Sequence, residues 1–145
     1  MTLSEENKNS LLVSLHKMIE ESANYSVNDI QHNRAQQLIN YPPNGGFTAN
    51  ELAELNKLAG NAVLRSALRK VIANASADVV FGLFNQIDGT SDPDIEVGEW
   101  SEVMLVDYSD EYEPESMLHD EFYDTYWDWI DRRKSSEERL DLSDK

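Results

Sequence analysis

The N-terminal third of the chain carries apolar residues at helical spacing. Thr2 and Glu5 stand three residues apart, as in a capping box, and the apolar positions after them share one face, which predicts a helix over about 3–23. The same start signal recurs at Ser26, with an acid three residues later. The weaker helix that it opens is expected to end before Pro42, because a residue that precedes proline is kept out of the α region.

The middle of the chain is its most helical stretch. Thr48 and Glu51 have the spacing of another capping box. Gly60 is expected to break or bend the helix that follows, because glycine suits a helix end better than a helix interior. Residues 79–87, VVFGLFNQI, are apolar on nearly every side, which predicts a fully buried element that ends at Gly89.

The last third combines a strand candidate with a closing helix. Residues 100–108, WSEVMLVDY, are rich in β-branched and aromatic residues and have no helical period. A lone strand leaves its backbone groups unsatisfied, so residues 95–97 or a second copy of the chain would have to pair with it. Pro114 suits the first turn of a closing helix over about 114–134. The pattern predicts a mainly α fold, a compact bundle of about five helices with one short strand or β-hairpin near residues 95–108.

Length and composition point to one folded domain. The chain has 145 residues, 40% of them hydrophobic, with thirteen aromatic residues (3 Trp, 6 Tyr and 4 Phe), which is enough for a packed core. We predict a single domain over 1–145, made of a near-neutral helical half (1–76), an acidic half (77–134) and a frayed tail (135–145). The absence of cysteine rules out disulfides and thiolate metal sites. The sequence has neither a signal peptide nor about 20 consecutive apolar residues, so we expect a cytoplasmic protein with no membrane partner.

The negative charge is concentrated in the second half of the chain. Residues 1–76 carry seven Lys/Arg and seven Asp/Glu, whereas residues 77–145 carry 5 Lys/Arg and 21 Asp/Glu, a net charge of −16. Residues 71–131 contain seventeen acids and no Lys or Arg. Such a field repels nucleic acids and anionic membranes, and it favours basic partners or cations. Direct binding of DNA or RNA is therefore the function that the sequence most clearly excludes.

One alternative is a divalent-cation site, or a metal-dependent enzyme, built on the acidic loop at 88–99. Its oxygen-rich turn offers the ligands that calcium and magnesium need, and His119 could add a ligand or a general base. The loop lacks the glycine of an EF-hand at the sixth position, where Pro93 stands, and no second histidine is near His119 in the sequence. Solvated carboxylates that cap a turn explain the same residues. The weak metal candidates are Asp88, Asp92, Asp94 and Glu96.

The predicted closing helix has an aromatic face and an acidic face. The aromatic stripe consists of Leu118, Phe122, Tyr126 and Trp129, and the opposite ridge of Asp120, Asp124, Asp128 and Asp131. Like charges four residues apart repel by a few tenths of a kcal/mol, whereas burial of a large apolar side chain is worth about 1.5–3 kcal/mol. We therefore expect the aromatic stripe to face the core. Arg65 and Arg69, on the central helix, are expected to pair with acids of the ridge.

These patterns favour an interaction protein without catalytic residues or cofactors. We expect an acidic module of the immunity or inhibitor type, which docks a basic partner such as a toxin or a nucleic-acid-binding protein. The predicted partner-binding residues are Asp110, Glu111, Tyr112, Glu113, Asp120, Glu121, Tyr123, Asp124, Trp127 and Asp128. The remaining alternative is a homodimeric structural protein, paired through the strand at 100–108.

Overall fold

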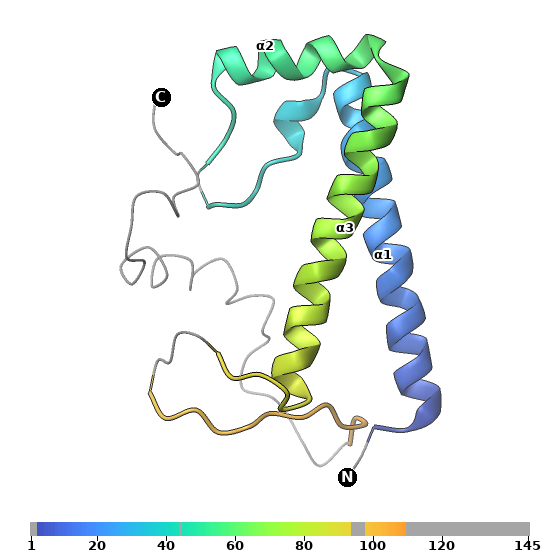
Figure 1. Cartoon of the computed structure of the whole chain (residues 1–145), viewed down its shortest axis with the longest axis vertical. Coiled ribbons are helices and arrows are strands. Elements are labelled where there is room, and N and C mark those ends of the chain that lie inside the picture. Colours follow the sequence, from blue (N-terminus) through green and yellow to red (C-terminus); the bar gives the residue numbers. More distant parts are fainter. Residues whose placement is uncertain (1–2, 44, 94–97, 110–145) are drawn as a thin grey trace. The chain divides into compact units, whose positions relative to one another are not determined.

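The described part of the chain is all-α (Figure 1). The computed structural model describes residues 3–43, 45–93 and 98–109. Its α-helices and 3₁₀ helices (η) are, in chain order, α1 (Glu5–Gln31), η1 (Ala35–Gln37), α2 (Ala49–Lys57), η2 (Leu58–Gly60) and α3 (Ala62–Ile87). The predicted helical class is confirmed for this part. The predicted closing helix at 114–134 lies outside the described residues.

The chain divides into two compact units. The first comprises Met1–Tyr25 with Ser66–Glu111, and the second comprises Ser26–Arg65 with Tyr112–Lys145. Both α1 and α3 therefore contribute residues to each unit. The prediction of one domain over 1–145 stays a prediction.

Ser4 caps the start of α1. Its hydroxyl accepts a hydrogen bond from the backbone N–H of Asn7 (3.3 Å), and its carbonyl accepts one from the N–H of Lys8 (2.9 Å). A serine at this position satisfies an N–H group that the first helical turn leaves free. The predicted helix start is thus confirmed to within two residues, and Thr2, the predicted capping residue, lies outside the described residues.

α1 ends in a Schellman motif. The N–H of Asn33 donates to the carbonyl of Ile30 (3.1 Å), and the N–H of Arg34 donates to the carbonyl of Asp29 (2.8 Å). Asn33 has a φ of 56°, a left-handed conformation that asparagine tolerates better than most residues. The two bonds satisfy carbonyls that would otherwise remain free at the helix end.

α1 is one helix where the sequence predicted two. No glycine or proline occurs in residues 3–41 to interrupt it. A capping box at Ser26 would require the carboxylate of Asp29 to bond back to the N–H of Ser26. The Asp29 carboxylate instead bonds forward, to the side chain of Arg34. The predicted second start is therefore wrong, and the helix continues to Gln31.

α2 begins with the predicted capping box. The hydroxyl of Thr48 accepts from the N–H of Glu51 (3.2 Å), and the carboxylate of Glu51 accepts from the N–H of Thr48 (2.6 Å). The predicted break at Gly60 is also confirmed, because η2 ends there. Asn61 then caps α3, since its side chain accepts from the N–H of Leu64 (2.9 Å).

α3 ends as predicted, just before Gly89. The N–H of Gly89 donates to the carbonyl of Gln86 (3.4 Å), and the N–H of Thr90 donates to the carbonyl of Asn85 (2.9 Å), which forms a second Schellman motif. Gly89 has a φ of 66°, a conformation that costs glycine little because it has no Cβ. Both long helices therefore end in the same hydrogen-bond pattern.

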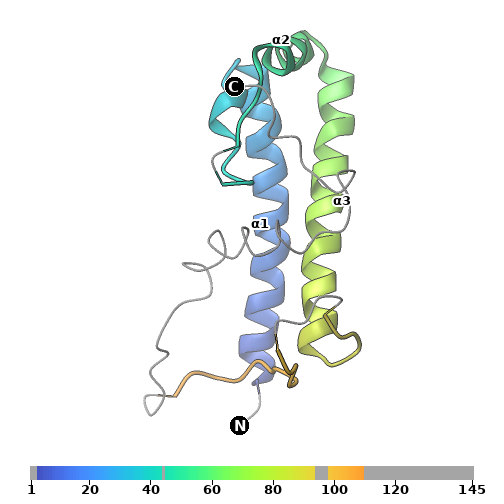
Figure 2. The ribbon, with the colours of Figure 1, turned by 90° about the vertical axis from the view of Figure 1, so that its left-hand side faces the viewer.

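Within the first unit, α1 and α3 lie side by side and run in opposite directions (Figures 1 and 2). Half-buried side chains recur every fourth residue on α3, at Leu68, Ile72, Ser76, Val80 and Phe84. On α1 the half-buried residues include Leu15 and Ile19, and Ala23 is fully buried. The guanidinium of Arg69 also donates to the side-chain oxygen of Asn24 on α1 (3.2 Å). Burial of these apolar side chains stabilises the pair of helices.

The predicted full burial of residues 79–87 is wrong. These residues form the last turns of α3, where Val79, Phe81 and Leu83 are 74%, 67% and 54% exposed. A helix that is apolar all round is buried only where neighbours surround it. Among the described helices, α1 lies along one side of this part of α3 (Figure 2). The sequence shows that residues 79–87 are apolar, but it does not show how many elements pack around them.

Residues 98–109 contain no strand, so the strand predicted at 100–108 is wrong for the described residues. β-Branched and aromatic residues favour a strand where a second strand supplies hydrogen bonds and a packed face. No described segment supplies such a ladder, and residues 95–97, the expected partner, lie outside the described residues. The side chains of Met104 and Tyr108 are accordingly exposed.

Asp107 links the segment at 98–109 to the start of α1 through hydrogen bonds. Its Oδ1 accepts hydrogen bonds from Nδ2 of Asn7 (2.8 Å), the backbone N–H of Ser4 (3.1 Å) and the hydroxyl of Ser4 (3.4 Å). The bond from Asn7, followed by that from the Ser4 backbone, lowers the pKa of Asp107, because both bonds favour the charged carboxylate. The carboxylate also lies at the positive end of the α1 dipole, which favours the same form.

Replacing Asn7 with alanine should raise the pKa of Asp107 toward its ordinary value of 3.8, because the hydrogen bond that lowers it most is lost. The measurement is an NMR titration of the Asp107 carboxyl carbon. Since the pKa of Asp107 is depressed in the folded protein, its hydrogen bonds contribute stability above the ordinary pKa. That contribution is lost as the pH falls through the folded-state pKa.

Asn9→Ala is the matched control, because Asn9 is an exposed asparagine of the same helix. It should leave the Asp107 titration unchanged. If Asp107 titrates at the same pH in the wild type and in Asn7→Ala, the Asn7 bond does not stabilise the carboxylate.

Candidate functional site

Exposed carboxylates mark the described part of the acidic half. The exposed acids there are Asp78, Asp88, Asp92, Glu99 and Glu102. None of them forms an ion pair with another described residue. The ion pairs within the described ranges are Lys8–Glu5, Lys17–Glu21, Arg34–Asp29 and Lys57–Glu54, all in the near-neutral half. These five exposed carboxylates therefore remain available to a cation from outside this part of the chain.

The predicted partner-binding residues, at 110–128, lie outside the described residues and stay a prediction. The same holds for the expected pairing of Arg65 and Arg69 with the aspartate ridge. In the described part, the guanidinium of Arg65 donates to the carbonyl of Leu58 (3.1 Å) and to that of Ala59. Arg65 thus satisfies carbonyls of η2 and ties this turn to the start of α3.

The described residues test only part of the cation alternative. Asp88 and Asp92 are both exposed, and Asp94, Glu96 and His119 lie outside the described residues. Within the described ranges, no three Asp, Glu or His side chains gather in a way that could hold a metal ion. The cation site on the acidic loop stays a prediction.

A fully buried carboxylate lies at the end of α1. Asp29 is 0% exposed, and its Oδ1 accepts hydrogen bonds from Nε (3.0 Å) and Nη2 (2.6 Å) of Arg34. Its Oδ2 has no hydrogen-bond partner among the residues that the structure describes. The Arg34 side chain is 45% exposed, so it is in contact with solvent while it pairs with the buried carboxylate. A carboxylate that loses its hydration needs such a compensating cation.

Sequence reasoning missed this pair. The two residues stand at the first and last positions of the Schellman motif, where the backbone already brings them together. Both the backbone N–H and the side chain of Arg34 bond to Asp29, which fixes the direction in which the chain leaves α1. Ile30 and Ala35 are buried beside them. An acid and an arginine five residues apart across a helix end was the available signal.

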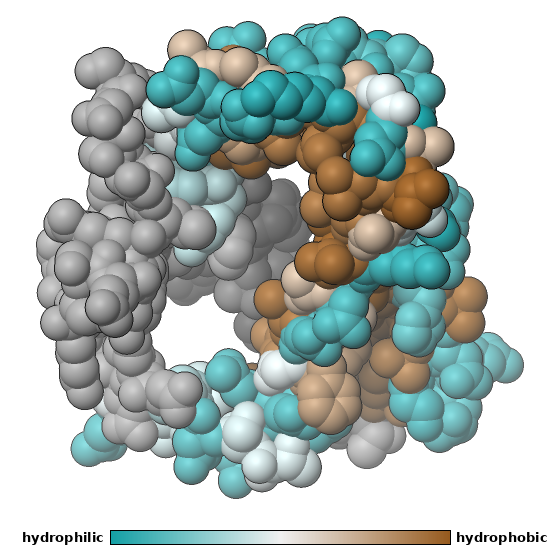
Figure 3. All heavy atoms as spheres, turned by 45° about the horizontal axis from the view of Figure 1, so that its top comes forward, coloured by the Kyte–Doolittle hydropathy of each residue, from teal (hydrophilic) through white to brown (hydrophobic). Residues whose placement is uncertain are grey.

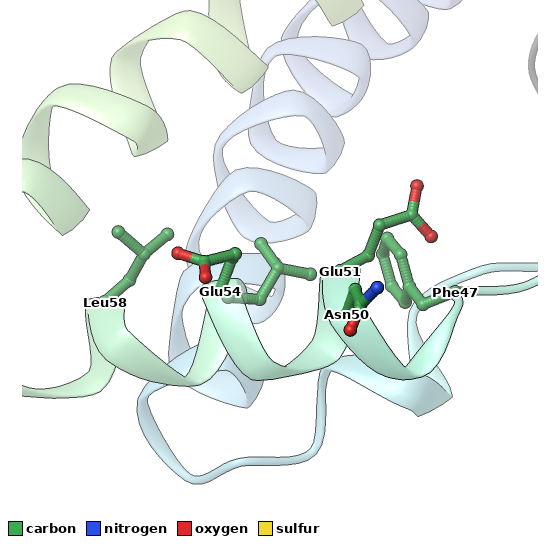
Figure 4. A pocket seen from close by; sticks show the side chains of 6 residues that line it. Phe47, Asn50, Glu51, Glu54 and Leu58 are labelled. Atoms are coloured by element: carbon green, nitrogen blue, oxygen red, sulfur yellow. The ribbon is translucent and has the colours of Figure 1, made fainter.

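α2 carries an open hollow of about 580 Å³ (Figure 4). Phe47, Leu55 and Leu58 line it with half-buried apolar side chains, and Asn50, Glu51 and Glu54 add exposed polar groups. The Glu51 carboxylate holds the capping box, and that of Glu54 pairs with Lys57. The hollow can therefore receive an apolar side chain of a partner, with carboxylates close to any neighbouring Lys or Arg.

The first unit contains a second, largely apolar cavity of about 460 Å³. Its lining residues come from α1 and the residues just before it, from the end of α3 and the residue after it, and from the segment at 98–109. They are Leu3, Lys8, Leu11, Leu12, Phe81, Phe84, Asn85, Ile87, Asp88, Met104 and Leu105. Lys8, its one lining base, already pairs with Glu5 at 2.5 Å. The cavity lies where the segment at 98–109 meets the two helices.

No family model matches the chain, and neither a curated protein nor a solved structure matches it. Among the described residues, no helix is both long enough and apolar enough to cross a membrane.

Replacing Arg34 with methionine should lower the free energy of unfolding by about 2 kcal/mol, because it leaves the Asp29 carboxylate buried without its hydrogen-bond donors. Urea unfolding followed by circular dichroism measures the change. The matched control is Lys57→Met, which removes an exposed ion pair on α2 and should cost less than about 1 kcal/mol. Equal losses in the two variants would mean that the buried pair does not hold the end of α1.

Proposed function

We propose that the chain is an acidic interaction module that docks a basic protein, in the manner of an immunity or inhibitor protein. The observation that carries the proposal is the 61-residue stretch at 71–131, with seventeen acids and no Lys or Arg. Its described acids add support, because all but Asp107 are exposed and none forms an ion pair within the described part. Asp107 is held by hydrogen bonds to the start of α1.

A concentrated negative charge acts on a partner before contact. It attracts a cationic surface during diffusion and raises the association rate, and it repels surfaces of its own sign. A toxin that cuts nucleic acid, or another nucleic-acid-binding protein, presents Lys and Arg side chains toward phosphates. Carboxylates on a folded chain can form ion pairs with the same Lys and Arg side chains. We therefore assign the partner to the nucleic-acid-binding proteins, toxins that cut nucleic acid included.

Charge raises the association rate and selects partners of the opposite sign, whereas apolar contacts contribute most of the binding affinity. The hollow on α2 supplies such a contact, since Phe47 and Leu58 line it and Glu51 lies at its edge (Figure 4). The aromatic residues Tyr112, Tyr123 and Trp127, outside the described part, are the proposed anchors of the acidic face. We place the module in the cytoplasm, because a chain without cysteine fits a reducing compartment.

The test is capture of proteins from the source organism on the full chain, followed by affinity measurement with the purified partner. We expect a basic protein that is retained at 0.1 M salt and lost at 0.5 M, because the screening length shortens from about 10 Å to about 4 Å. Replacing Asp120, Asp124 and Asp128 together with asparagine should raise the Kd at least tenfold. The capture of no basic protein at either salt concentration would contradict the proposal.

A second triple variant separates a defined site from total charge. Glu6, Glu20 and Glu21 are exposed acids of the near-neutral half, and their replacement by glutamine removes the same number of charges. This control should change the Kd by less than about threefold. Equal weakening in both triple variants would mean that the partner senses only net charge and does not dock on the acidic face.

A further inference from the structure

α3 carries an apolar ridge on its exposed side. The ridge consists of Ala67, Val71, Ala75, Val79 and Leu83, each four residues after the last, and all five are exposed. Val71, Val79 and Leu83 are 64%, 74% and 54% exposed. In Figure 3, hydrophobic residues gather along α3. A row of this length, about 24 Å at 1.5 Å per residue, is long enough to pack against another helix.

The spacing of the ridge determines how a helix can pack on it. Residues four apart form ridges inclined to the helix axis, and two such ridges interdigitate when the helices cross at about −50°. The half-buried row that begins at Leu68 is one residue, or about 100°, further round the helix, so the ridge lies beside the covered side of α3 and not on it.

A charged row runs beside the ridge. Lys70, Asn74 and Asp78 are exposed and also stand four residues apart, one residue before Val71, Ala75 and Val79. Asp78 accepts a hydrogen bond from the side chain of Asn74 (2.8 Å), and neither Lys70 nor Asp78 forms an ion pair within the described part of the chain. Opposite charges thus flank Asn74 at equal distances along the helix.

We infer that the α3 ridge is the interface of a homodimer. With a two-fold axis at Asn74 and Ala75, residues four before the axis meet residues four after it in the second copy. Val71 then packs against Val79 of the second copy, and Lys70 pairs with Asp78 of the second copy. By symmetry each contact is made twice, as an interface between identical surfaces requires.

The charges select a second copy over other occupants. An acidic segment, including this chain's own residues 110–131, would place like charges near Asp78, and a basic partner would place them near Lys70. A second copy satisfies both charges. Helices that cross at about −50° share a short contact, so we expect a weak dimer that dissociates on dilution. Of the acids cited for the proposed docking, this interface uses Asp78 alone, and its existence does not depend on that proposal.

Sedimentation velocity on the full chain, from about 2 to 200 µM, tests the inference. The wild type should show a monomer–dimer equilibrium. Lys70→Glu alone and Asp78→Lys alone should each raise the dissociation constant at least tenfold, because each places like charges in both symmetric contacts. The double variant Lys70→Glu/Asp78→Lys should return to within about threefold of the wild type. Circular dichroism should show the same helix content in every variant.

Lys17→Glu controls for net charge, because it makes the same change at an exposed lysine of α1. It should leave the dimer unchanged within about threefold. A chain that stays monomeric at 200 µM would overturn the inference, and the ridge would then be covered by another part of the chain or by another protein. A dimer that tolerates both single variants, or that the double variant does not restore, would overturn it as well.

Discussion

Uncompensated negative charge is the constraint on which the rest of this structure depends. The acids of the second half repel one another, and self-repulsion of this kind opposes a compact state. The ion pairs of the described part lie in the near-neutral half, where they leave that charge untouched. Asp107 shows how a carboxylate of the acidic half is held without a cation, by neutral donors at the start of a helix. The charge that remains is the physical basis of the proposed docking of a basic partner.

Local hydrogen bonds determine the bounds of the helices in the described part. Asn33 and Gly89 end the two long helices in Schellman motifs, and Thr48 with Glu51 starts α2. These motifs set where each helix begins and ends with little help from distant residues. Few apolar side chains are fully buried among the described residues, and large ones such as Val79 stay exposed. Apolar side chains that are not fully buried contribute to both proposed interfaces, the hollow on α2 and the ridge on α3.

The sequence predicted those features that depend on neighbours in the chain. The capping box at Thr48, the break at Gly60 and the stop at Gly89 all follow from local backbone chemistry, and all are confirmed. Predictions of features that depend on residues distant in the sequence were wrong. The strand at 100–108 needed a ladder partner, and the burial of 79–87 needed elements on every side of α3.

The candidate functional residues divide in the same way. Asp88 and Asp92 form no ion pair with another described residue, and this could be anticipated, because a stretch without Lys or Arg offers them no local partner. The buried carboxylate of Asp29 could not, because its spacing from Ser26 looked like a helix start and only the folded chain turns it toward Arg34. The alternation of Val and Ala on α3 was visible in the sequence, but its exposure was not.

The salt dependence of thermal unfolding tests the central claim most directly. If the acids of the second half are unneutralised, raising sodium chloride from about 0.02 to 0.5 M at pH 7 screens their repulsion and should raise the Tm by several degrees. Choline chloride should give the same rise, because the effect is screening and not the binding of a particular cation. A Tm that stays constant or falls with salt would mean that the chain pairs these carboxylates internally, and the account would then be wrong.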